Sequence, residues 1–367
     1  DLLSLLALPA ASAIPAGLTA AARPEVISAS GPYRLADKDG YVPEHSIHLV
    51  RNEAWEESSD PVRRAWVDEI SVEIGADPAE IQRRLTDGRA DLSGDVGPVA
   101  AIANGVAADR VVAAPNGCLR YLFMNTRVAP FTFRSVRAAV RAALDRNAVA
   151  ALQPGRGHAA ASILPPTVEG YDATLAVPDA YPALARRILA GTSAFRTGFA
   201  TRLVVGSRAL DRQEAAAVVR ALRPAGIRAA ITAVPIASLY EDRYEVPAAK
   251  VPMGIATWCA DWSGLGGRSM LGPLVDGRGL SSRGNTNYTG MHDVSVERTL
   301  DAALAERDPA KARAIWILAD ARASDVAVVV PLIHLTETSL LGPRVNGFVA
   351  HPYFVRGDLT AIWLNAS

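Results

Sequence analysis

Alternating apolar and polar residues predict strands separated by helices in the first part of the chain. Segment 65–74 (AWVDEISVEI) alternates with a period of two, which is typical of a half-buried strand. Asp77 and Pro78 have the residue types of a helix N-cap and a first helical position, and Gly88 marks the predicted end of that helix. This region is therefore predicted to alternate strand and helix.

Longer apolar runs predict buried strands and amphipathic helices in the rest of the chain. The predicted strands lie at 119–125, 201–205, 227–234, 251–257 and 326–335. The predicted helices lie at about 134–152, 178–190, 211–223 and 309–324. Because a helix separates the strands at 201–205 and 227–234, these three elements are expected to form an α/β crossover unit. The whole pattern indicates mixed α/β lobes.

The composition is that of a globular protein with room for two domains. The chain has 367 residues, of which half are hydrophobic and 21% are charged, and this length supports two separate cores. The 38 basic and 38 acidic residues give zero net charge. The basic residues form no block or stripe, which argues against nucleic acid as a partner.

The N-terminal segment Leu2–Ala13 superficially has the apolar run and small residues of a signal peptide. It starts at Asp1, however, and lacks an initiator methionine and a basic region. We interpret it as an amphipathic helix within a longer chain. No other stretch approaches the length of a membrane span.

The two cysteines and one aspartate carry the most specific chemistry. Cys118 and Cys259 each lie beside a predicted strand, which favours a disulfide, and two buried free thiols are the alternative. Asp261 lies between Trp258 and Trp262 after an apolar run. A carboxylate between indole rings suits a small cationic group, because the charge orients it and the rings supply apolar contact. This pattern indicates a secreted binding protein.

The residue patterns of common enzyme sites are absent from the sequence. There is no HExxH, Cys-x-x-Cys or G-x-S-x-G motif, and the glycine-rich stretch 264–267 lacks the lysine of a phosphate-binding loop. Six histidines are scattered along the chain: His45, His48, His158, His292, His334 and His351. We therefore expect no catalytic residue, metal site or cofactor.

An ordered set of short motifs resembles the extracytoplasmic solute-binding proteins of peptide-type ABC importers, the oligopeptide- and dipeptide-binding family. The set covers nearly the whole chain, and each motif is weak alone. In order, the motifs are 31–35 (GPYRL), 51–55 (RNEAW), 67–70 (VDEI), 121–125 (YLFMN), 164–166 (LPP), 258–262 (WCADW), 285–288 (NTNY) and 329–332 (VVPL).

The resemblance implies an α/β, two-lobed periplasmic-binding-protein-like fold with mixed sheets flanked by helices. Residues 1–124 are expected to form the remaining part of lobe I, 125–335 lobe II, and 336–367 a return to lobe I. Family members have a sizeable N-terminal portion ahead of the point where this chain begins. The first lobe is therefore expected to be incomplete.

The resemblance also implies roles for the central residues. The oligopeptide-binding branch bridges the cysteines that match Cys118 and Cys259, so the disulfide is expected here. Asp261 is expected to bind the α-ammonium group of a ligand, with Trp258 and Trp262 lining the pocket. A helix cap or surface turn is the alternative for Asp261, and a core position is the alternative for Trp262.

Three further residues are weaker candidates for ligand binding. Arg208 resembles the position of a carboxylate-binding arginine in the dipeptide branch, and a solvated helix-cap arginine is the alternative. The other arginine position of that branch falls on Ile255. Asn287 and Tyr288 are candidates for facing the ligand cleft that is expected between the two lobes. An ordinary turn is the alternative for both.

The expected function is capture of short peptides outside the cytoplasm and delivery to the permease subunits of an ABC transporter. We expect a monomer that is lipid-anchored through the portion preceding this chain. Another solute, such as a nickel chelate, haem or an oligosaccharide, is an alternative on the same scaffold. A hydrolase or a regulator built on this scaffold is a further alternative.

Overall fold

The computed structural model describes residues 6, 8, 11–12, 29–37, 39–94, 97–262, 267–353 and 357–365. Most of the segment 2–13, interpreted above as a helix, lies outside these residues. The chain forms two compact units: a central unit of residues 115–336, and a terminal unit of residues 2–114 and 337–367. The lobe boundaries expected from the resemblance stay a prediction.

The main mixed sheet has the strand order β5-β11-β6-β10-β8-β9, and β7 also pairs with β11. Most of this sheet belongs to the central unit, whereas β5, the first residues of β6 and the last residues of β11 belong to the terminal unit. β6 is antiparallel to β10, whereas β8 is parallel to both β10 and β9. The strands are β5 (Leu92–Ser93), β6 (Val111–Met124), β7 (Gly157–Ala159), β8 (Phe199–Gly206), β9 (Ile227–Val234), β10 (Met253–Cys259) and β11 (Val329–Leu341). The parallel β8–β9 pair, with α7 between its strands in the sequence, confirms the predicted crossover unit.

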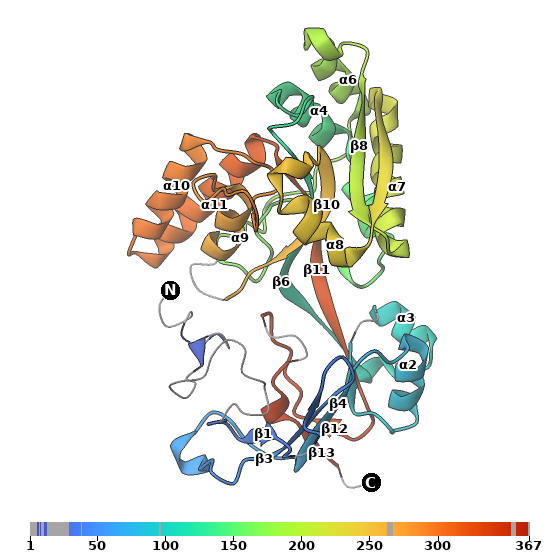
Figure 1. Ribbon diagram of the computed structural model, residues 1–367, viewed down its shortest axis with the longest axis vertical. Coiled ribbons are helices and arrows are strands. Elements are labelled where there is room, and N and C mark those ends of the chain that lie inside the picture. Colours follow the sequence, from blue (N-terminus) through green and yellow to red (C-terminus); the bar gives the residue numbers. More distant parts are fainter. Residues whose placement is uncertain are drawn as a thin grey trace. The chain divides into compact units, whose positions relative to one another are not determined.

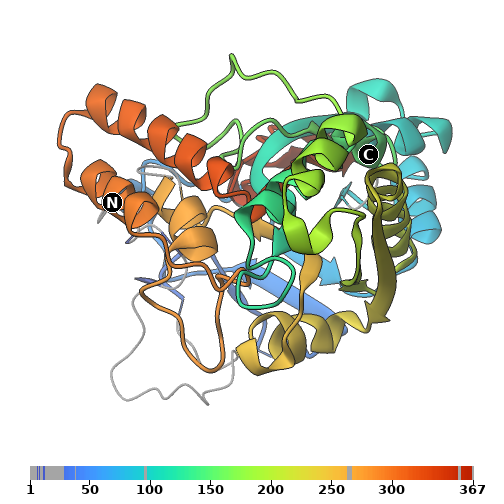
Figure 2. The ribbon, with the colours of Figure 1, turned by 90° about the horizontal axis from the view of Figure 1, so that it is seen from above.

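Helices cover the two faces of this sheet. Helices α9, α10 and α11 gather on one side of the central unit, and α4, α6 and α7 gather on the other (Figures 1 and 2). Their bounds are α4 (Arg134–Ala143), α5 (Arg146–Ala150), α6 (Pro182–Ala190), α7 (Ala209–Leu222), α8 (Ile236–Leu239), α9 (Gly267–Val275), α10 (Val294–Ala305) and α11 (Pro309–Asp325). A large apolar core contains residues of β6, β8 and β10 together with residues of α4, α6 and α7.

Alternate residues of β6 point to opposite faces of the sheet, as strand geometry requires. Leu122 and Met124 belong to the large core, together with Ile255 and Met253 of β10. Tyr121 has the opposite parity and therefore points to the other face. Both faces are buried over residues 119–124, so this part of the strand is apolar on both sides except at Arg120 and shows no clean alternation.

Two predicted elements differ from the structure. The helix predicted at 134–152 is broken after Ala143, because the side chain of Asp145 accepts a hydrogen bond from Ala148 N at 2.9 Å and starts α5. Apolar periodicity alone does not reveal this cap. The strand predicted at 65–74 is shortened to β4 (Glu69–Glu73).

The terminal unit contains short elements. Its strands are β1 (Tyr33–Leu35), β2 (Tyr41–Val42), β3 (Ser46–Arg51), β4, β12 (Val345–Asn346) and β13 (Trp363–Leu364), and its α-helices include α2 (Pro78–Thr86) and α3 (Pro98–Ala103). Strand β3 pairs antiparallel with β1, β2 and β4. Asp77 accepts from Ala79 N at 2.9 Å, which confirms the predicted N-cap of α2.

Arginines of α4 bind the carboxyl end of α11. Three of them donate to the backbone carbonyls of residues 324–326: Arg134, Arg137 and Arg141. Arg137 is buried, and its guanidinium donates to Val326 O at 3.0 Å and to Phe131 O at 2.8 Å. Cations favour the negative end of a helix dipole, so these contacts hold α4 against α11.

A buried carboxylate holds the irregular connector that follows β7. Asp320 on α11 accepts hydrogen bonds from Ile163 N at 3.0 Å and from Leu164 N at 2.9 Å, one on each oxygen. His334 Nε2 on β11 donates to Ser162 O at 2.9 Å. Side chains of two elements thus satisfy backbone groups that a connector without regular structure leaves unpaired.

Replacing Arg137 with methionine keeps the apolar stem and removes the donors. The free energy of unfolding is expected to fall by about 1–3 kcal/mol, because the buried carbonyl of Phe131 and the partly buried carbonyl of Val326 lose a charged partner. Arg134→Met is the matched control, since the hydrogen bond of Arg134 is exposed, and its effect should stay within about 0.5 kcal/mol. Urea denaturation measures the free energy of unfolding of both variants. Equal losses of stability would show that burial of the hydrogen bond does not matter.

Burial raises the pKa of Asp320 to about 6 from its ordinary value of 3.8. The folded protein therefore retains a proton that the unfolded chain releases. The free energy of unfolding is expected to fall as the pH rises from about 4 to about 6, by up to about 3 kcal/mol from this group. Denaturation curves across this range should show that the free energy of unfolding depends less on pH in Asp320→Asn than in the wild type. An identical pH dependence would contradict a raised pKa of Asp320.

Candidate functional site

The end of β10 is fixed to β6 by one covalent bond and one hydrogen bond. Cys259 is the register partner of Cys118, and the two form a disulfide with an S–S distance of 2.03 Å. Ala260 N then donates to Gly117 O at 2.8 Å. The expected disulfide is confirmed, and it anchors the point from which the WCADW segment leaves the sheet.

Asp261 follows this anchor directly. Its side chain is exposed, and within the described ranges it has neither a hydrogen-bond donor nor a cation as partner. Nearby atoms nevertheless exclude part of the water, and this desolvation raises the pKa of the carboxyl group. A carboxylate without a partner is available to bind a cation from solution. Residues 263–266, which include most of the glycine-rich stretch, lie outside the described residues.

The two tryptophans around Asp261 are both half-buried. Trp258 Nε1 donates to Ser269 O in α9 at 2.8 Å, so its polar group is used within the protein. Trp262 Nε1 is buried and has no acceptor among the residues that the structure describes. Each indole therefore combines an apolar surface with partial exposure, the property expected of a pocket wall.

Tyr288 belongs to an aromatic cluster on the face of the sheet opposite the large core. Its ring centroid lies 5.5 Å from that of Phe123 and 5.3 Å from that of Tyr244. Gly254 makes room for the cluster, because a Cβ there would lie 2.6 Å from Phe123 and 2.8 Å from the Tyr244 hydroxyl. Tyr288 is 6% exposed, and burial raises the pKa of its hydroxyl. In this arrangement it packs as a core residue.

The side chain of Asn287 stabilises the turn in which it lies. Its Nδ2 donates to Asp276 O at 3.1 Å and to Met291 O at 3.0 Å. Its Oδ1 accepts from Thr289 Oγ1 at 2.6 Å. These contacts are those of an ordinary turn, which is the alternative to a cleft-facing position that the sequence left open for Asn287.

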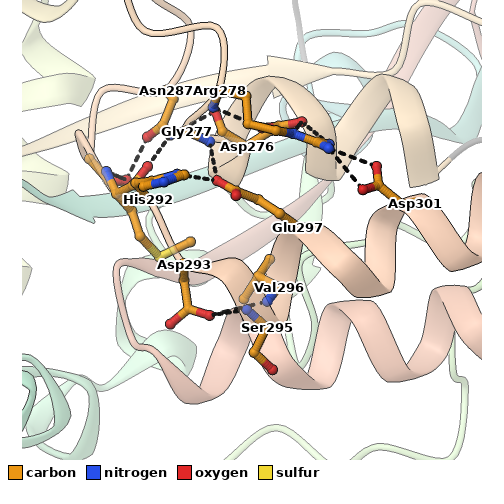
Figure 3. A network of polar contacts seen from close by, with 12 residues as sticks. Asp276, Gly277, Arg278, Asn287, His292, Asp293, Ser295, Val296, Glu297 and Asp301 are labelled. Atoms are coloured by element: carbon orange, nitrogen blue, oxygen red, sulfur yellow. Dashed lines mark hydrogen bonds and ion pairs between the residues drawn. The ribbon is translucent and has the colours of Figure 1, made fainter.

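Ion pairs surround this turn. Figure 3 shows Arg278 between the carboxylates of Asp276 and Asp301, at 2.7 and 2.8 Å. His292 Nδ1 lies 2.6 Å from Glu297 Oε1 (Figure 3). The charged groups of this network are thus paired with one another.

A hollow of about 260 Å³ lies beside the turn. It is lined by Gly272, Asp276, Gly279, Leu280, Gly284, Asn285, Thr286 and Asn287. The carboxylate of Asp276 is paired with Arg278, and the amides of Asn285 and Asn287 are hydrogen-bonded within the protein. This lining contains Asn287 but not Asp261, so the predicted residues do not all gather at one hollow.

Arg208 is the N-cap residue of α7. Its Nε donates to Asp211 Oδ2 at 2.9 Å, and its side chain is 63% exposed. No hydrogen bond or ion pair between described residues joins it to Asp261. Arg208 thus pairs with Asp211 of its own helix, with much of its guanidinium open to solvent, and its role in binding a carboxylate stays a prediction.

A buried charge network lies on the core-facing side of β6, and sequence reasoning missed it. Arg120 donates to Glu214 at 2.6 Å and to Asp211 at 2.8 Å, both on α7. Gln153 Nε2 donates to the second Glu214 oxygen at 2.6 Å. Burial raises the pKa of Glu214, and its contacts with Arg120 oppose this shift. Arg208 also pairs with Asp211, so two guanidinium groups face two carboxylates and the charges balance.

The sequence contained a signal for this network. Arg120 interrupts an otherwise apolar strand, and an unpaired buried guanidinium would be costly. Asp211 and Glu214 are three residues apart in the predicted helix 211–223 and so share one helix face. The spacing thus supplied candidate partners, although only the fold decides which strand meets that face.

Neither a metal site nor a membrane span is found in the described part of the chain. Among these residues, no three His, Cys, Asp or Glu side chains are grouped so that they could hold a metal ion. None of the described helices has the length and apolar character needed to cross a bilayer.

Solved structures of related proteins share this fold. The clavulanic acid biosynthesis oligopeptide binding protein 2 matches with a TM-score of 0.87 and 27% identity, over 100% of this chain and 68% of that chain. DppA from Helicobacter pylori, an ABC transporter-associated periplasmic binding protein in complex with the peptide STSA, matches with a TM-score of 0.72 and 18% identity, over 91% and 62% of the two chains. The expected periplasmic-binding-protein fold is therefore confirmed.

A sequence relative carries a different ligand in its name. Heme-binding protein A of Haemophilus influenzae is 25% identical over 238 residues, which are 64% of this chain and 42% of that protein. This chain thus spans less than half of that relative.

The sequence model of the bacterial extracellular solute-binding proteins, family 5 (middle), matches residues 1–268. This match covers most of the chain and includes the disulfide, Asp261 and both tryptophans. The chain therefore belongs to family 5 of the bacterial extracellular solute-binding proteins.

Proposed function

We propose that this protein captures short peptides outside the cytoplasm and delivers them to the permease subunits of an ABC transporter. The observation that carries the proposal is the unpaired Asp261 carboxylate, which follows a disulfide-anchored strand end and lies between two half-buried indoles. Further support comes from the 27% identical relative, whose name is that of an oligopeptide-binding protein.

In this proposal Asp261 accepts a charge-assisted hydrogen bond from the α-ammonium group of the peptide. Trp258 and Trp262 contact the first side chain through their ring faces. Such recognition uses groups that every peptide has, so it tolerates different sequences. Ligand binding would favour one conformation of the protein over others, which is a population shift without a covalent step.

Binding of the peptide carboxylate is assigned to Arg208, whose exposed guanidinium has donors beyond those bonded to Asp211. Asp211 competes with a ligand for this cation, so we expect the anchor to be weak. Ile255, at the other arginine position of the dipeptide branch, is 1% exposed and offers no charge. The amino end of the ligand is therefore expected to contribute more to affinity.

The remaining parts of the proposal follow from this role. The protein acts as a monomer without enzymatic activity or cofactor and without a nucleic-acid partner. It works on the extracytoplasmic side of the membrane and is lipid-anchored.

Asp261→Asn preserves the size of the side chain and removes its charge. The affinity for tripeptides and tetrapeptides with a free amino end is expected to fall about 10- to 100-fold, because a hydrogen bond to a charged group contributes about 1.5–3 kcal/mol. Titration calorimetry on the full gene product measures this loss. Asp242→Asn, at another exposed aspartate, is the control. Unchanged binding in Asp261→Asn would remove the basis of the proposal.

Haem is the second candidate ligand, because of the relative named for haem binding. Absorbance titration separates the two candidates. If peptide is the ligand, added haem should produce no saturable change of its absorption band, and N-acetylation of the peptide should weaken binding about as much as Asp261→Asn. A saturable haem spectrum that peptide does not displace would favour haem instead.

A further inference from the structure

Helix α9 contains a proline in its interior. Pro273 lies two residues before the end of the helix, and an interior proline typically costs about 3 kcal/mol. Proline has no N–H, so it cannot donate to the carbonyl four residues earlier, which is that of Ser269. Its ring also pushes that carbonyl away from the helix axis.

A side chain from the neighbouring strand binds this same carbonyl. Trp258 Nε1 on β10 donates to Ser269 O at 2.8 Å, a normal hydrogen-bond distance. The indole thus takes the place of the helical donor that Pro273 lacks. One interaction satisfies both the N–H of a half-buried indole and a helix carbonyl deprived of its usual partner.

Helix α9 provides a fixed support for this bond. Its first residue, Gly267, lies so close to Trp316 of α11 that an added Cβ would come within 2.1 Å of the indole ring. Trp316 is fully buried. The start of α9 is therefore packed directly against α11, and the position of Ser269 two residues later is set by that contact.

The Trp258–Ser269 bond adds a third contact close to Asp261 in the sequence. The Cys118–Cys259 disulfide and the bond from Ala260 N hold the chain to β6, and the indole of Trp258 is held by α9. The three residues before Asp261 are therefore each held by a partner outside β10, and such pre-organisation lowers the entropy lost when a ligand is bound.

We propose that Pro273 is a positioning residue of the ligand site: it leaves the Ser269 carbonyl to the indole of Trp258, and this bond orients the indole that forms one wall beside Asp261. This inference rests on the proposed function, because it assigns Trp258 and Asp261 to ligand binding. Pro273 itself does not touch the ligand in this account.

Pro273→Ala tests the inference, because alanine restores the N–H and the helical bond to Ser269. The stability of the protein is expected to stay equal or to rise, since alanine is the better helix former. Peptide affinity should nevertheless fall about tenfold, and the indole N–H of Trp258 should exchange faster with solvent. Pro309→Ala is the matched control, because Pro309 is at the start of α11, where a missing N–H frees no carbonyl.

NMR of the indole N–H groups reports directly on the hydrogen bond from Trp258 to Ser269, through the rate at which the N–H exchanges with solvent. The chain has six tryptophans, so the Trp258 signal is assigned by its loss in Trp258→Phe. That variant keeps an aromatic ring but has no donor. Because Trp258→Phe and Pro273→Ala remove the same bond, the double variant should bind peptide about as weakly as the weaker single variant.

Two results would overturn the inference while leaving the proposed function intact. One is an unchanged exchange rate of the Trp258 N–H in Pro273→Ala together with wild-type affinity. The other is an additive loss of affinity in the double variant. If the wild-type protein binds no peptide, the proposed function fails, and the exchange rate of the Trp258 N–H still decides whether Pro273 controls the bond.

Discussion

The antiparallel pairing of β6 with β10 is the constraint on which the rest of the central unit depends. The register runs from Met253 opposite Met124 to Cys259 opposite Cys118, where it is closed by the disulfide. Because side chains alternate along both strands, this one register assigns every residue to one of two faces. A shift by one residue would exchange the apolar core with the aromatic cluster and separate the cysteines.

The two faces of this strand pair have different chemistry. The core-facing side contains Arg120, whose charge is balanced by carboxylates of α7. The opposite side contains Phe123 and Trp258, which pack near Tyr288 and α9 respectively. Charges are therefore confined to one face, and the exposed carboxylate of Asp261 appears only where the strand has ended. Asp261 is thus a carboxylate without a partner among the described residues, and it lies between two indoles in the sequence.

Irregular segments of the central unit are fixed by side chains that bind backbone groups. Asp320 binds the amides of the connector after β7, arginines of α4 bind the carbonyls that end α11, and Trp258 binds a carbonyl of α9. In each case a polar side chain satisfies a backbone group that regular structure leaves unpaired. Rigid connections of this kind allow a loop to hold a functional side chain in place.

Local patterns in the sequence determined the long strands of the central unit, the capped helix at Asp77 and the mixed α/β class, because periodicity and capping act over a few residues. Motif order identified the fold and the disulfide. Only the tertiary structure decided that Asn287 and Tyr288 pack internally, that Arg208 pairs with Asp211, and that Trp258 binds a helix carbonyl. These outcomes depend on which distant element meets each side chain, and such partners are set by long-range packing that no local pattern records.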